Sequence, residues 1–141
     1  MRQSGNDSDT DSSGDLVVGV AEHPGYLHVT VTGRNTAANV RKYLFNVHEA
    51  CVQRKCTVVL IEENLRGPGL GIGTIHDIVS QASNRTRPAV TKIAYVDANR
   101  GHPPGPMGFA ETVAVNRGVN VRLFSDVGTA RSWIEDGMQR K

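Results

Sequence analysis

Residues 57–83 constrain the fold of this chain more than any other stretch. They begin with four consecutive aliphatic residues, 58–61, a run too short for an independent helix and typical of a strand covered on both faces, with Glu62 and Glu63 expected to end it. A glycine-rich loop follows, and then apolar residues spaced by three and four indicate an amphipathic helix that packs on the sheet. These residues are Ile72, Ile75, Ile78, Val79 and Ala82. Strand, loop and helix in this order predict the central crossover of an α/β domain.

The rest of the chain supplies the neighbouring elements of that crossover. Residues 16–33 contain two β-rich runs separated by Pro24-Gly25, a pair that suits a type II turn and predicts a hairpin. A helix capped by Asn35 or Thr36 separates this hairpin from the central strand. We expect further strands at 89–96 and 119–124 and further helices at 107–116 and 125–137. The sequence therefore predicts an α/β fold, β-β-α-β-α-β-α-β-α, with four helices and a five-stranded mixed sheet that is antiparallel only at its first hairpin.

Composition divides the chain into a leader and one domain. Residues 1–15 are mostly Ser, Asp, Gly and Asn, which cannot bury enough apolar surface to offset the entropy of ordering. We therefore predict a disordered acidic leader at 1–15 and a single domain at 16–137, since a chain of 141 residues leaves room for one core.

Charge and hydropathy exclude several classes of function. The formal net charge of +2 comes from 16 basic and 14 acidic residues spread along the chain, so we expect no nucleic-acid partner. No apolar run approaches the ~20 residues that span a bilayer, which predicts a cytoplasmic protein without a membrane span.

Cys51 and Cys56 are expected to be reduced thiols, because they lack the neighbouring histidines of a zinc site. His28, on the polar face of its strand, is expected at the surface.

The candidate site lies where the central strands end. The carboxyl ends of parallel strands meet at one edge of a sheet, so the loops at 62–73 and 97–106 should lie side by side. They bring together carboxylates, guanidinium groups, an imidazole and a glycine-rich turn. The candidate ligand- or partner-binding residues are Glu62, Glu63, Arg66, Gly67, Gly69, Gly71, Thr74, Asp97, Asn99, Arg100 and His102.

The glycine-rich loop does not carry a known nucleotide-binding motif. Gly67, Gly69, Gly71 and Gly73 precede a helix, where backbone N–H groups favour an anion. However, the spacing matches neither G-x-G-x-x-G nor a Walker loop, so a conformationally permissive turn is the favoured interpretation, with Thr74 capping the helix. No nucleophile elbow and no histidine pair at metal-ligand spacing is present in the sequence. We therefore predict no cofactor, no metal and no enzyme activity.

Four short segments resemble the SpoIIAA-like fold of STAS domains and the related bacterial STAS/SEC14-type proteins. They are residues 29–33, 58–62, 93–96 and 121–126. The resemblance implies a small regulatory domain. In the STAS family the loop after the central strand commonly holds an Asp-Ser pair, and phosphorylation of the serine breaks a complex with a kinase or anti-sigma partner. Residues 66–71, the corresponding loop here, contain neither Asp nor Ser. For SEC14-related lipid carriers the resemblance implies an apolar cavity, but the sequence shows no surplus of apolar side chains to line one.

Together these features predict a small non-enzymatic regulatory or sensing module that binds a protein partner through the edge at 62–73. One alternative is a carrier of a small apolar or anionic ligand at the same edge. A weaker alternative is a hydrolase that uses His102 and the nearby acids. The sequence leaves a homodimer open.

Overall fold

The computed structural model describes residues 15–86, 89–99 and 105–139. The predicted leader therefore lies, apart from Asp15, outside the described residues. The strands follow the predicted order and form one mixed sheet, β2-β3-β4-β5-β6, with β2 antiparallel to β3 and every other neighbouring pair parallel. The strands are β2 (Val17–His23), β3 (Tyr26–Arg34), β4 (Val58–Arg66), β5 (Lys92–Asp97) and β6 (Val121–Phe124). The helices are α1 (Ala37–Arg54), α2 (Ile72–Thr86), α3 (Gly105–Asn116) and α4 (Val127–Gln139).

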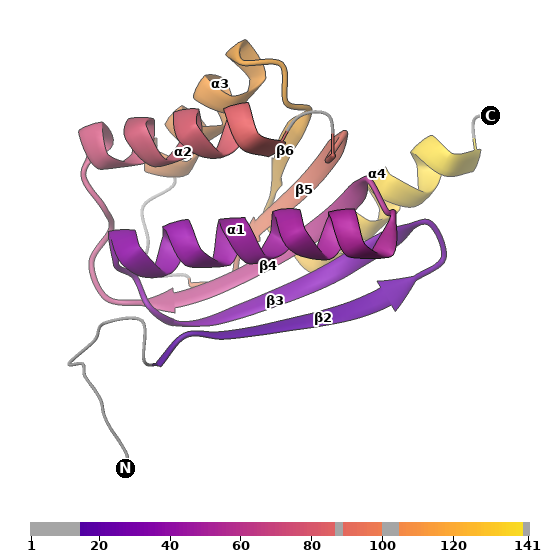
Figure 1. Cartoon of the computed structure of the whole chain (residues 1–141), viewed down its shortest axis with the longest axis horizontal. Coiled ribbons are helices and arrows are strands. Elements are labelled where there is room, and N and C mark those ends of the chain that lie inside the picture. The colour runs from indigo at the N-terminus through magenta and orange to yellow at the C-terminus, as the bar shows by residue number, and fades with distance from the viewer. Residues whose placement is uncertain (1–14, 87–88, 100–104, 140–141) are drawn as a thin grey trace.

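The sheet separates two unequal helical layers (Figure 1). Helices α1, α2 and α3 lie over one face, and α4 lies against the other. Strand residues alternate between the two faces, so Leu60 packs with Ala130 and Ile134 of α4, whereas Val59 and Ile61 belong to the larger core beneath α1. The central strand is therefore buried on both faces, as its unbroken aliphatic run predicts.

Local sequence signals set most of the element boundaries. Gly25 has a φ of 87°, which the third position of the predicted type II turn requires. The Thr36 hydroxyl accepts a hydrogen bond from the Asn39 amide at 3.1 Å and caps α1, and Asp126 accepts one from the Thr129 amide at 2.7 Å at the start of α4.

The Cys51 thiol is free and buried, and burial together with the nearby Cys56 raises its pKa to about 11. No helix in the described ranges is both long and apolar enough to cross a membrane.

Several predicted boundaries are wrong. Strands β5 and β6 begin at Lys92 and Val121, later than the predicted residues 89 and 119. Strand β4 does not end at Glu62 and Glu63 but continues to Arg66, because its last residues remain paired with β3. Helix α2 already begins at Ile72, where the Gly71 carbonyl accepts the Ile75 amide at 3.0 Å, so Thr74 lies inside the helix and does not cap it. Ile72 is 51% exposed and does not pack on the sheet. Helix α3 begins at Gly105, two residues earlier than predicted.

Candidate functional site

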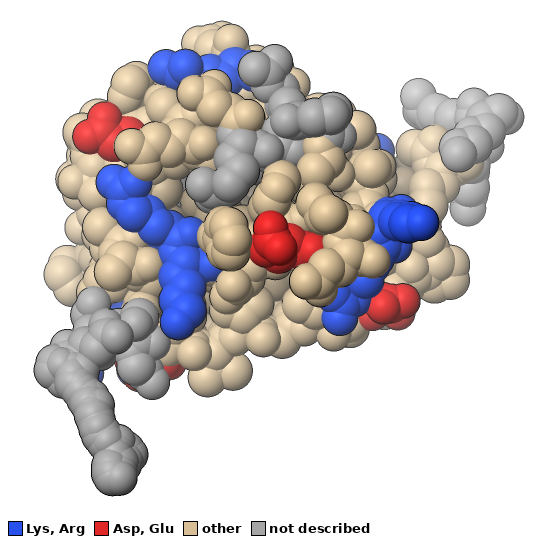
Figure 2. Space-filling view, viewed as in Figure 1, with Lys and Arg blue, Asp and Glu red and all other residues tan. Residues whose placement is uncertain are grey.

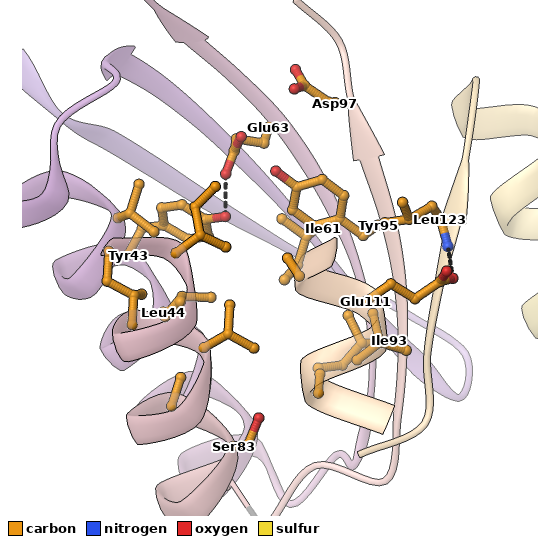
Figure 3. A pocket seen from close by; sticks show the side chains of 18 of the residues that line it. Tyr43, Leu44, Ile61, Glu63, Ser83, Ile93, Tyr95, Asp97, Glu111 and Leu123 are labelled. Atoms are coloured by element: carbon orange, nitrogen blue, oxygen red, sulfur yellow. Dashed lines mark hydrogen bonds between the residues drawn. The ribbon is translucent and has the colours of Figure 1, made fainter. Parts of the chain in front are cut away.

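A cavity of about 150 Å³ lies between the sheet and the helices α1, α2 and α3 (Figure 3). Its walls are almost entirely apolar, with Leu44 from α1, Ile78 from α2 and Ile61 and Ile93 from the sheet among them. The sequence shows no surplus of apolar side chains that would indicate this cavity, although a carrier of a small apolar ligand was one of the alternatives left open. Alanines 82, 110 and 114 contribute short side chains on the helical side, which leaves space that longer residues would fill.

The outer side of this cavity is bridged by polar side chains. Arg41 on α1 donates a hydrogen bond to the Gln81 side chain on α2 and so connects the two helices. Figure 2 shows Lys and Arg side chains in separate groups on the face viewed, with acidic side chains among them. The Arg41–Gln81 pair therefore adds polar groups at the outer side of the cavity, where α1 faces α2.

One end of the cavity carries a buried polar cluster formed by Tyr43, Glu63 and Tyr95. Glu63 is only 5% exposed, and the Tyr43 hydroxyl donates a hydrogen bond to its carboxylate. Tyr95 lies beside them at the same end of the cavity (Figure 3). Burial raises the pKa of both phenols well above 10.0, and the negative charge of Glu63 acts in the same direction, so both hydroxyls stay protonated. A carboxylate that accepts a hydrogen bond from the Tyr43 phenol, with Tyr95 beside it, thus faces an otherwise apolar space.

Residues 98 and 99, which follow β5, contact the last part of β4, so the predicted ranges 62–73 and 97–106 lie side by side where they are described. The Ala98 amide donates to the Glu63 carbonyl at 2.7 Å, and the Asn99 side chain donates to the Leu65 carbonyl at 2.7 Å. Asp97 accepts from the Asn99 amide at 3.0 Å and also lines the cavity. Of the predicted site residues, the structure therefore brings Glu63, Asp97 and Asn99 together.

The other predicted residues are placed elsewhere. Glu62 lies on the opposite face from Glu63 and pairs with His28 at 3.0 Å. His28 is therefore not the surface histidine that was expected, because its side chain is only 15% exposed. Thr74 lies within α2, and Arg100 and His102 lie outside the described residues.

The glycine-rich loop is open. Gly67 has a φ of 106°, and among Gly67, Gly69, Gly71 and Gly73 it alone has a positive φ. An added Cβ would meet nothing within 4 Å at any of these four glycines. A permissive turn is therefore needed only at Gly67, where the chain leaves β4. Gly69 borders the cavity, so this loop forms part of its rim.

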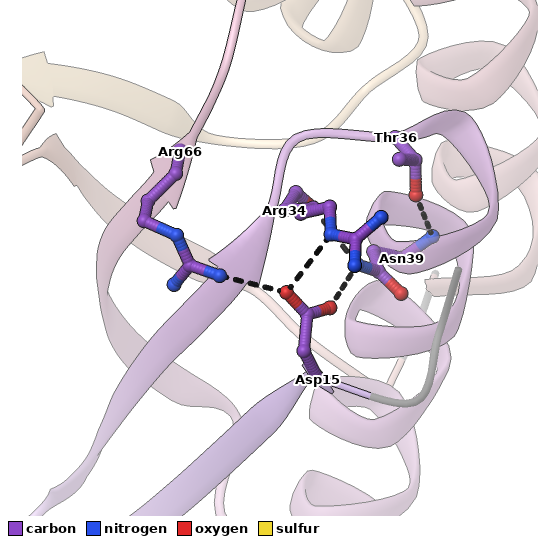
Figure 4. A network of polar contacts seen from close by, with 5 residues as sticks. All are labelled: Asp15, Arg34, Thr36, Asn39 and Arg66. Carbon is purple, nitrogen blue, oxygen red and sulfur yellow. Dashed lines mark hydrogen bonds and ion pairs between the residues drawn. The ribbon is translucent and has the colours of Figure 1, made fainter. Parts of the chain in front are cut away.

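Arg66 lies beside the cavity rim in a separate polar network (Figure 4). Its Nη2 is 2.8 Å from the Asp15 carboxylate, and Arg34 Nε is 3.5 Å from the same oxygen. Desolvation acts to raise the pKa of Asp15, but hydrogen bonds from the Arg34 backbone and the Asn39 side chain and the charges of Arg34 and Arg66 outweigh it, so this pKa lies below 3.8. Asp15 is thus held as a carboxylate.

We expect this network to contribute to the loss of stability of the fold at acidic pH. Because the pKa of Asp15 is lower in the folded than in the unfolded chain, its contribution is complete above the ordinary value of 3.8 and is lost as pH falls through the folded-state pKa. Thermal unfolding followed between about pH 5 and pH 3 should therefore show a shallower loss of stability in Asp15→Asn than in the natural sequence. Parallel curves for the two proteins would contradict this expectation.

Sequence reasoning missed the cavity and its two tyrosines. Tyr43 occupies an apolar position of α1 and Tyr95 an apolar position of β5, so the sequence pattern alone marks both only as core residues. A tyrosine on an apolar face is nevertheless a signal, since a buried hydroxyl needs a polar partner. Only the fold shows that this partner is Glu63. Within the described residues, no group of three or more His, Cys, Asp and Glu side chains is arranged to hold a metal ion.

Comparisons of the chain with models of known protein families and with curated proteins find no match.

Proposed function

We propose that this domain binds a small, largely apolar molecule in the cavity beneath α1, α2 and α3, and acts as a ligand-sensing or carrier module without enzyme activity. The observation that carries the proposal is an apolar cavity with a buried Tyr–Glu–Tyr cluster at one end. Small-molecule sites are typically concave and apolar, with a few polar groups that fix the orientation of the ligand. A space of about 150 Å³ is sufficient for a ring of roughly six carbons.

The polar cluster favours a ligand that donates a hydrogen bond. Burial keeps both phenols protonated, and the Tyr43 hydroxyl donates to the Glu63 carboxylate. Because a carboxylate accepts hydrogen bonds and carries negative charge, a hydroxyl or amino group at one end of an apolar ligand would complement it. The buried carboxylate therefore favours an apolar ligand with a donor group over the anionic ligand of the alternative given above.

The earlier predictions are compatible with this role. The order of elements and the mixed sheet support the SpoIIAA-like assignment, which we retain as a proposal together with a cytoplasmic location. A protein partner at the edge of residues 62–73 would sense the ligand directly, because Gly69 and Leu70 in that loop border the cavity. The hydrolase alternative through His102 receives no support from the described residues.

The cavity can be tested with benzyl alcohol as the probe. We expect this probe to shift the backbone amide signals of Ile61 and Tyr95 in a two-dimensional NMR titration. Ala82→Leu adds side-chain volume inside the cavity and should weaken binding at least about tenfold, a loss of roughly 1.4 kcal/mol. Ala38→Leu makes the same substitution at an exposed position of α1 and should bind as the natural sequence does. Equal binding by both variants, or no shifts in the natural sequence, would refute the proposal.

A further inference from the structure

Two arginines lie side by side at the end of the sheet, where β3 and β4 end and the loop after β4 begins. Arg34 and Arg66 are register partners on the neighbouring strands β3 and β4, and their side chains are 65% and 64% exposed. Like charges on directly opposed strand residues destabilise a sheet. The arrangement becomes favourable when an anion lies between the two guanidinium groups, which is the position that the Asp15 carboxylate occupies (Figure 4).

The remaining contacts show a site built for a carboxylate. Arg66 and Arg34 approach one oxygen of Asp15, and the Asn39 Nδ2 lies 3.4 Å from the other. Asn39 is fully buried, and its amide is oriented by a hydrogen bond of 2.8 Å to the Arg34 carbonyl. Guanidinium and amide donors converging on both oxygens of one carboxylate give a charge-assisted arrangement that is stronger than neutral hydrogen bonds.

The backbone of Asp15 and Leu16 lies close against Gly33, which keeps Asp15 at this site. A Cβ at Gly33 would lie 3.0 Å from the Asp15 carbonyl oxygen and 3.1 Å from the Leu16 Cα, so a side chain there would push this segment away. The sheet pairing of β2 begins only at Val17. Asp15 can therefore leave the site without breaking any strand pairing, while the three donors stay in place on β3, β4 and α1.

From this geometry we infer that Arg34, Arg66 and Asn39 form a binding site for an acidic segment of a protein partner, and that Asp15 is its internal, displaceable occupant. The partner places an aspartate or glutamate carboxylate where the Asp15 carboxylate now lies. The inference is independent of the ligand proposed for the cavity, because Arg34, Asn39 and Arg66 are not among the residues that line it.

The test uses a fluorescently labelled hexa-aspartate peptide and the full chain, with binding followed by fluorescence anisotropy at low salt. Asp15→Asn removes the competing carboxylate and should tighten peptide binding roughly tenfold. Glu22→Gln is the matched control, since it makes the same change in net charge and frees Arg54 from an ion pair of 3.0 Å elsewhere on the surface. It should leave the affinity of the natural sequence almost unchanged. Adding Arg34→Gln and Arg66→Gln to Asp15→Asn should abolish the gain.

Two outcomes would overturn the inference. Equal tightening by Asp15→Asn and Glu22→Gln would show that only net charge matters, and binding that survives loss of both arginines would place the peptide elsewhere. If Asp15→Asn unfolds, the natural sequence serves instead, because peptide titration should shift the Nε–H signals of Arg34 and Arg66 but not that of Arg54. Equal shifts of all three signals would likewise refute the site.

Discussion

Replacing Leu60 by alanine is expected to lower the free energy of unfolding by about 2–5 kcal/mol. Leu60 is 0% exposed and packs between the sheet and α4 with Ala130 and Ile134. Truncation removes buried apolar surface and also leaves a cavity, because neighbouring strands and the helix hold the surrounding atoms in place. Urea unfolding monitored by circular dichroism measures the effect directly.

The adjacent residue provides a matched control for this prediction. Ile61 is also buried, at 2% exposed, but it points to the opposite face and borders the existing cavity. It therefore has fewer packed neighbours to lose, and Ile61→Ala should cost less than Leu60→Ala. Equal losses for the two variants would contradict the assignment of the space beside Ile61 as a cavity.

Replacing Tyr43 by phenylalanine is expected to cost about 1–3 kcal/mol of stability, although the ring itself is preserved. The Tyr43 hydroxyl donates to Glu63, and both side chains are buried. Without this donor, a carboxylate that is almost removed from water loses one of its hydrogen bonds, which is more costly than losing a bond between solvated groups. Thermal and urea unfolding of the variant measure the loss.

Tyr26→Phe is the matched control for Tyr43→Phe. Tyr26 is equally buried, but its hydroxyl accepts a hydrogen bond of 3.1 Å from Arg131, whose guanidinium group has further donors and remains half-buried. We expect a loss of only about 0.5–1.5 kcal/mol there. If Tyr43→Phe lowers the free energy of unfolding no more than Tyr26→Phe does, the buried hydrogen bond from Tyr43 to Glu63 does not stabilise the fold as its burial predicts.

The prediction of the fold rested on local patterns that tertiary packing did not override. The aliphatic run 58–61, the Pro24-Gly25 turn and the capping Thr36 each specify their element through nearest-neighbour chemistry, and the structure agrees with all three. The end of β4 was predicted wrongly because its extension depends on pairing with β3, and strand pairing is a property of two distant segments. For the same reason, Glu62 and Glu63 looked equivalent in the sequence although they face opposite sides of the sheet.

The candidate site was predictable only in part. The adjacency of the ranges 62–73 and 97–106 follows from the rule that parallel strands end at one edge, and Asn99 indeed donates to the Leu65 carbonyl near the end of β4. The pairing of Glu62 with His28, 34 residues apart, and that of Asp15 with Arg66, 51 residues apart, gives no local signal in the chain.

The sequence by itself determined the class of fold, the order of its elements and the edge at which the loops gather, because hydrophobic periodicity and turn chemistry act over a few neighbouring residues. Only the tertiary structure decided that three helices enclose a cavity rather than a filled core, and that Tyr43 and Tyr95 meet Glu63 at its end. Whether space is filled depends on how side chains from distant segments fit together, and a pattern of apolar residues specifies which face is buried but not how closely it packs.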